Sequence, residues 1–144
     1  ETDLRKKSFW AGYFTHLLTD ALYSRLISLP VESRFGAYRE NPGLSKSVKR
    51  EWYDADFAFF EKNKSPAFED FKKYRAFKED YPSIYKHGEI GKQMKYIVKF
   101  YRRKRSENVE FIYTDRQAFD GFVQNACAII LDEMHKNAMI NMFN

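Results

Sequence analysis

The fold is decided by residues 8–24, which read SFWAGYFTHLLTDALYS. On a helical wheel this run has apolar residues on every side, and a helix of that kind is normally central to its fold. The run is too short, and with its His, Asp and Thr residues too polar, to read as a membrane span. It predicts a core helix over residues 4–28 that ends before Pro30.

The composition is that of one folded domain. The chain has 144 residues, of which 44% are hydrophobic and 18% aromatic. That length can bury a core of its own. The net charge of +5 permits an anionic partner without requiring one. The single cysteine, Cys127, excludes an internal disulfide, and its place on the apolar face of a predicted helix favours a small core residue over a reactive thiol.

Apolar periodicity and helix-end signals predict four further helices and no strand. A loop with Gly and Pro residues is expected over residues 31–46, and a helix N-cap at Ser47. Thr114 and Gln117 are spaced as a capping box for the last helix. The four helices are predicted over residues 47–62, 66–78, 88–105 and 114–136. The expected fold is an all-α, single-domain bundle of about five helices over residues 1–144, around a buried first helix.

Within the first helix, His16 and Asp20 are the most informative residues. Asp20 is the only residue of the 8–24 run with a full charge, and His16 precedes it by four positions. Four residues make about one helical turn, so both side chains project from one face. A buried carboxylate needs a partner, and a metal ion is one, because imidazole and carboxylate groups are both zinc ligands.

Two further carboxylates lie in an aromatic-rich run, residues 51–60, which read EWYDADFAFF. If the helix is continuous from Ser47, a helical wheel places Asp56 between two apolar flanks and Asp54 on the opposite, solvated side. If the helix begins at Asp54 instead, that residue is an N-cap and the wheel argument weakens.

The first two helices are therefore each expected to bury a carboxylate, and one hypothesis is that His16, Asp20 and Asp56 converge on a metal ion. The structural alternative is a buried polar network. In that network Asp20 or Asp56 pairs with an arginine such as Arg25 or Arg75, and His16 is hydrogen-bonded in the core.

The run GYFTHLLTDA, residues 12–21, resembles the central helix motif of the zinc-dependent phospholipase C-like family. The resemblance implies an all-helical fold, phosphoester hydrolysis, zinc or another divalent metal as cofactor, and His16 and Asp20 as metal ligands. Residues 52–57, WYDADF, also resemble a pattern of bacterial members of the family. Carried over, Asp56 is a ligand or the base that orients the attacking water, and Asp54 is a further candidate ligand.

The family takes more metal ligands than this chain offers. Those ligands come from the segment before the motif helix and include several histidines, whereas this chain has only His16, His87 and His135. The chain starts at Glu1 rather than Met, so we expect it to be the C-terminal part of a slightly longer protein. Either the missing segment completes the site, or the site is inactive.

Two other function classes remain open. The abundant aromatic residues suit a non-catalytic helical interaction module. A stripe of basic residues in the predicted fourth helix suits the phosphate backbone of a nucleic acid, although a solvated helix face explains it better because no nucleic-acid motif accompanies it. The stripe comprises Lys92, Lys95, Lys99, Arg102 and Arg103. No transmembrane segment is predicted, and the expected location is cytoplasmic.

Overall fold

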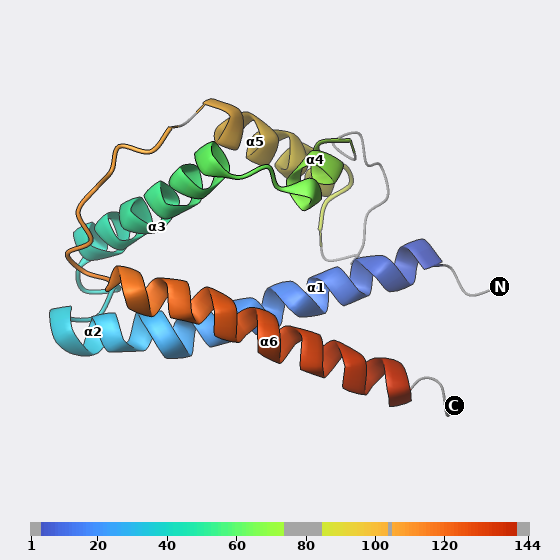
Figure 1. The fold of residues 1–144 in the computed structure, drawn as a ribbon, viewed down its shortest axis with the longest axis horizontal. Coiled ribbons are helices and arrows are strands. Elements are labelled where there is room, and N and C mark those ends of the chain that lie inside the picture. Colours follow the sequence, from blue (N-terminus) through green and yellow to red (C-terminus); the bar gives the residue numbers. More distant parts are fainter. Residues whose placement is uncertain (1–3, 74–84, 104, 141–144) are drawn as a thin grey trace. The chain divides into compact units, whose positions relative to one another are not determined.

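The computed structural model describes residues 4–73, 85–103 and 105–140, with the side chains of residues 5, 103 and 137–140 left out. Every regular element in these ranges is helical, which confirms the all-α fold class (Figure 1). The elements are α1 (Leu4–Tyr23), a π-helical turn η1 (Ser24–Ser28), α2 (Leu29–Phe35), α3 (Pro42–Lys62), α4 (Pro66–Lys73), α5 (Glu89–Arg103) and α6 (Arg116–Ile140).

The chain divides into two compact units. Unit 1 combines Glu1–Val48 with Phe111–Asn144, and unit 2 is the segment between them, Lys49–Glu110. Unit 1 therefore contains α1, η1, α2, the start of α3 and α6, whereas unit 2 contains the rest of α3, α4 and α5. The expectation that the whole chain is one domain stays a prediction.

We predicted that the first helical stretch ends before Pro30, and this is wrong. The Leu29 N–H donates to the Ser24 carbonyl, five residues back, and the chain continues directly into α2. Pro30 lies in the first turn of α2, where the missing proline N–H matters least. Gly36 is the C-cap of α2, and its φ of 96° is a backbone conformation that residues other than glycine rarely adopt.

The predicted loop over residues 31–46 is much shorter in the structure. α2 fills its first part, and α3 begins at Pro42 rather than at Ser47. Asn41 provides the cap, because its Oδ1 accepts a hydrogen bond of 3.1 Å from the Leu44 N–H. Asn-Pro was therefore the helix-start signal, with proline at the first helical position.

Two apolar clusters form the core of unit 1. In the first, Ile27 of η1 packs with Phe122 and Ala126 of α6. In the second, Val31 of α2 packs with Leu44 and Val48 of α3. α1 contacts α6, but none of its described side chains is fully buried, so the predicted burial of the first helix is wrong for residues 4–23; Ile27, near the end of the predicted helix, is buried. Partners within the unit cover only part of a helix whose sequence is apolar all round.

α6 begins one residue later than the predicted capping box implies. Its cap is Asp115, whose Oδ1 accepts a 2.8 Å hydrogen bond from the Gln117 N–H. Phe119, Phe122 and Ala126 are buried. Cys127, which we expected to find in the core, is exposed. Three apolar side chains of α6 are exposed in the structure: Val123, Ile129 and Met134.

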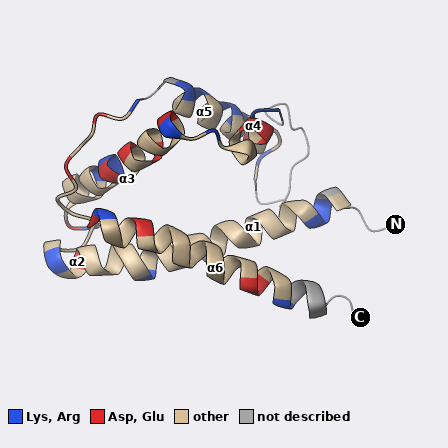
Figure 2. Cartoon of the chain, in the orientation of Figure 1, with Lys and Arg blue, Asp and Glu red and all other residues tan. Residues whose placement is uncertain are grey.

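Aromatic side chains fill unit 2. Phe57 of α3 is buried, and its ring lies 5.5 Å from that of Phe100 and 5.8 Å from that of Tyr101, both on α5. α5 is amphipathic as predicted: Val98 is buried, and one flank of the helix is basic (Figure 2). Its exposed basic residues are Lys92, Lys95, Lys99 and Arg102. α4 ends at Lys73, and the rest of the predicted 66–78 helix lies outside the described residues.

None of the helices in the described part of the chain has the length and apolar character needed to cross a membrane.

The Ile27 cluster gives a test of the core of unit 1. Ile27 is 4% exposed, whereas its neighbour Leu26 is 43% exposed. Ile27→Ala should lower the free energy of unfolding by about 2 to 4 kcal/mol, because it leaves a cavity against α6. Leu26→Ala should cost less than about 1 kcal/mol. Urea denaturation followed by circular dichroism measures both, and equal losses would contradict this account of the core.

Candidate functional site

The structure places His16 and Asp20 side by side on the surface of α1. His16 Nε2 lies 3.5 Å from Asp20 Oδ2, as the spacing of four residues predicts. The two side chains are 64% and 63% exposed, so the predicted burial of Asp20 is wrong. The neighbouring Thr15 Oγ1 contacts Met134 Sδ of α6 at 3.8 Å. Thr15 thus faces α6. His16 is the next residue along the helix, so its side chain points in a different direction and does not face α6.

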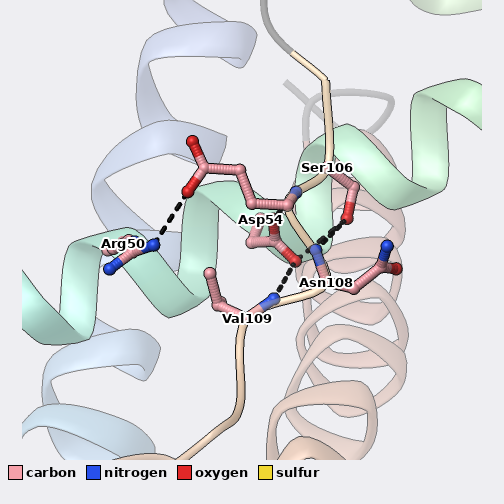
Figure 3. Close-up of polar contacts among 6 residues, drawn as sticks. Arg50, Asp54, Ser106, Asn108 and Val109 are labelled. Carbon is pink, nitrogen blue, oxygen red and sulfur yellow. Dashed lines mark hydrogen bonds and ion pairs between the residues drawn. The ribbon is translucent and has the colours of Figure 1, made fainter.

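Asp54 is a carboxylate of unit 2 whose two oxygens both accept hydrogen bonds, and it is 6% exposed. Its Oδ1 accepts a 2.6 Å hydrogen bond from the Glu107 N–H. Its Oδ2 accepts hydrogen bonds from the Ser106 hydroxyl at 3.0 Å and from the Val109 N–H at 3.2 Å (Figure 3). We predicted a solvated Asp54, and this is wrong because the segment after α5 covers that side of α3.

The covering segment, residues 106–109, has contacts that fix its shape around the carboxylate. Ser106 Oγ accepts a 3.1 Å hydrogen bond from the Asn108 N–H, and Asn108 has a φ of 52°. Asparagine is one of the few residues that tolerate this left-handed conformation. Arg50, one turn before Asp54, pairs with the Glu107 carboxylate at 2.8 Å (Figure 3). α3 therefore holds this segment through Arg50, Asp54 and Glu61, the last of which accepts a hydrogen bond from the Ser106 N–H.

Asp56 points into the aromatic interior of unit 2, as the helical wheel predicted. Its Oδ2 accepts a 2.7 Å hydrogen bond from the Tyr101 hydroxyl. Burial raises the pKa of Asp56 above its ordinary value of 3.8, and the Tyr101 hydrogen bond opposes part of that rise. Burial, and then the bond to Asp56, raise the pKa of Tyr101. The buried-network alternative named an arginine as the partner of Asp56, whereas the partner in the structure is Tyr101; Arg75 lies outside the described residues. The same alternative placed His16 in the core, which is wrong because its side chain is 64% exposed.

The four candidate site residues occur as one pair and two separate carboxylates. His16 and Asp20 are paired in unit 1. Asp54 and Asp56 belong to unit 2, where one contacts the segment after α5 and the other contacts α5 itself. Among the described residues, no three His, Cys, Asp or Glu side chains are grouped so that they could hold a metal ion. The convergence of His16, Asp20 and Asp56 stays a prediction.

The remaining histidines lie on the surface. His87 precedes α5 in a turn and is exposed. His135 is exposed on α6, which continues beyond it to Ile140 rather than ending near Lys136.

Sequence analysis did not anticipate the role of Asp54. Its hydrogen-bond donors lie 52 to 55 positions later in the chain, and two of them are backbone amides. A backbone amide has no signature in the sequence, because every residue except proline carries one. The only local signal was the pair of carboxylates among aromatic residues.

Comparison with known proteins adds no family assignment. No protein-family model, curated protein or solved structure matches the chain. Function must therefore be argued from the residues and contacts described above.

Replacing Asp54 should destabilise unit 2. In Asp54→Asn the side chain loses one acceptor oxygen and turns an NH₂ group toward backbone donors, so the free energy of unfolding should fall by about 1 to 3 kcal/mol. Asp70→Asn is the matched control, because Asp70 is exposed and paired only on the surface of α4. Thermal and urea unfolding compare the variants. If both lose the same stability, the 106–109 segment does not depend on Asp54.

The raised pKa of Asp56 predicts a pH dependence of stability. Between 3.8 and the raised pKa, the folded state binds more protons than the unfolded state. The contribution of Asp56 to stability therefore decreases as the pH rises through this window. Asp56→Asn keeps an acceptor for Tyr101 but cannot ionise, so its stability relative to the parent should increase from about pH 4 to about pH 7. Denaturation at a series of pH values measures this, and a flat or falling difference contradicts it.

Proposed function

We propose that the chain belongs to a metal-dependent hydrolase that acts on phosphoesters, with His16 and Asp20 as metal ligands. The observation that carries the proposal is the exposed His16–Asp20 pair on α1. The pair lies in the run that resembles the motif helix of the zinc-dependent phospholipase C-like family. Exposure supports this use, because an ion and its substrate can reach both side chains.

The geometry of the pair suits zinc. Ligand atoms about 2.1 Å from a tetrahedral zinc ion lie about 3.4 Å from each other. The His16 Nε2–Asp20 Oδ2 distance of 3.5 Å is close to that value. A catalytic zinc site usually has three protein ligands. In this proposal the remaining ligands come from polypeptide outside the described residues.

A bound metal ion would lower the pKa of a water molecule and neutralise charge on the phosphoryl oxygens. His16 Nε2 and Asp20 Oδ2 would hold the ion. The resemblance implies that Asp56 is a ligand or the base that orients the attacking water, and burial raises the pKa of Asp56, which makes the carboxylate a better proton acceptor. We assign Asp54 to the fold rather than to the metal, because both of its oxygens accept hydrogen bonds.

A second candidate is a non-catalytic helical interaction module. It is favoured by Trp10, Phe14 and Leu17, three exposed apolar side chains of α1. Their spacing of four and three residues puts them on one face of the helix. In this candidate function the His16–Asp20 pair is an exposed polar contact that contributes little to the free energy of unfolding, and it binds no metal.

Zinc binding separates the two candidates. His16→Ala should abolish zinc binding, because a single carboxylate remains in place of two ligands on α1. Elemental analysis and calorimetric titration of the chain with zinc measure this. His135→Ala is the control, since it removes an exposed histidine of α6 and should leave zinc binding unchanged.

An unchanged zinc content in His16→Ala would overturn the assignment of the ligands. Absence of zinc from the chain, after zinc is supplied, would favour the interaction module. If zinc binds, hydrolysis of bis(p-nitrophenyl) phosphate should require it and should fall in Asp20→Asn.

A further inference from the structure

Unit 2 contains a cavity of about 280 Å³ whose lining includes neither Asp54 nor Asp56. It lies at the end of α3, the start of α4 and the C-terminal part of α5. Its lining combines two kinds of side chain. The aromatic group comprises Phe57, Phe60, Phe68 and Tyr101, and the basic group comprises Lys64, Arg102 and Arg105.

The aromatic part of the lining is one connected cluster. The ring of Phe60 lies 4.9 Å from that of Phe68 and 5.3 Å from that of Tyr101. Phe68 and Tyr101 are 5.9 Å apart, so the three rings contact one another. The Tyr101 hydroxyl already donates to Asp56. This part of the cavity therefore offers ring surface, which favours a flat apolar group.

The charged part of the lining has an excess of positive charge. It contains two carboxylates, and both have partners: Glu61 accepts a 3.1 Å hydrogen bond from the Ser106 N–H and lies 4.0 Å from Arg105, whereas Glu69 pairs with Lys72. Lys64 and Arg102 have no ion pair with any residue that the structure describes. These two cations are therefore available to an anion.

Ser65, between the cations and the rings, adds a donor. Its Oγ accepts a 3.2 Å hydrogen bond from the Phe68 N–H at the start of α4. A hydroxyl that accepts one hydrogen bond still has its own proton to donate. The cavity thus combines two cations, a hydroxyl donor and an aromatic surface.

We propose that this cavity binds a small anion that carries a flat apolar ring. Arg102 and Lys64 bind the anionic group, because charge-assisted hydrogen bonds are the strongest that these side chains make. The ring packs on Phe60 and Phe68. The volume of about 280 Å³ is slightly below the range of drug-sized ligands, so the ligand is of the size of benzoate or phenyl phosphate.

The proposal is independent of the proposed hydrolase function. The cavity lies in unit 2 and involves neither His16 nor Asp20, so loss of zinc binding leaves it unaffected. Its anionic group is a phosphate or a carboxylate, since an arginine binds either in the same way.

Calorimetric titration of the chain tests the proposal. Phenyl phosphate or benzoate should bind with a dissociation constant in the millimolar range or below, and comparison of the two probes identifies the preferred anion. Inorganic phosphate has the anionic group without the ring, and phenol has the ring without the anionic group. Each should bind at least about tenfold more weakly than the probe that combines them. Equal binding of inorganic phosphate and phenyl phosphate would overturn the role of the rings.

Substitutions locate the binding site. Arg102→Gln should weaken binding of the better probe about tenfold, because one charge-assisted contact is lost. Lys64→Gln should act in the same direction. Lys95→Gln is the matched control, since Lys95 is exposed on the same helix but does not line the cavity. All three positions are exposed, and circular dichroism verifies that the variants fold.

Absence of binding by either ring-bearing anion would contradict the proposal. So would equal losses in Arg102→Gln and Lys95→Gln, because they would show attraction to the net positive charge rather than binding in the cavity.

Discussion

The contact on which unit 2 most depends is that between the Asp54 carboxylate and the segment after α5. One buried side chain satisfies two backbone amides and a hydroxyl at a point where the chain is no longer helical. A buried backbone amide without a hydrogen-bond acceptor lowers stability, so the amides of this segment need an acceptor wherever they are buried. Asp54 thereby ties α3 to a stretch that follows α5 by only a few residues.

Asp54 and Asp56 show how tertiary neighbours decide the chemistry of similar residues. They are two positions apart on one helix, and each finds a different partner. Asp54 accepts hydrogen bonds from backbone donors, whereas Asp56 accepts one from the Tyr101 hydroxyl, and burial raises the pKa of Asp56. The first is therefore suited to holding the chain in place. The second is suited to exchanging a proton, which fits the role of base that the resemblance implies.

The two units offer different surfaces for function. In unit 1 the His16–Asp20 pair is open to solvent beside exposed apolar residues of α1, an arrangement compatible with a metal ligand pair or with an interaction surface. In unit 2 the cations at the ends of α3 and α5 border a cavity with aromatic lining. The proposed metal ligands and the cations of the cavity are exposed side chains, whereas both oxygens of the buried Asp54 already accept hydrogen bonds within the fold.

Local sequence determined the helical class, the amphipathic character of α5, the one-turn spacing of His16 and Asp20, and the inward direction of Asp56. These follow from the 3.6-residue period, which acts within a few positions. Tertiary structure decided the rest. The exposure of α1 depends on how much of it α6 covers, and the burial of Asp54 depends on amides more than fifty positions away. Such outcomes depend on contacts between segments distant in sequence, and a single sequence carries no local signal for them.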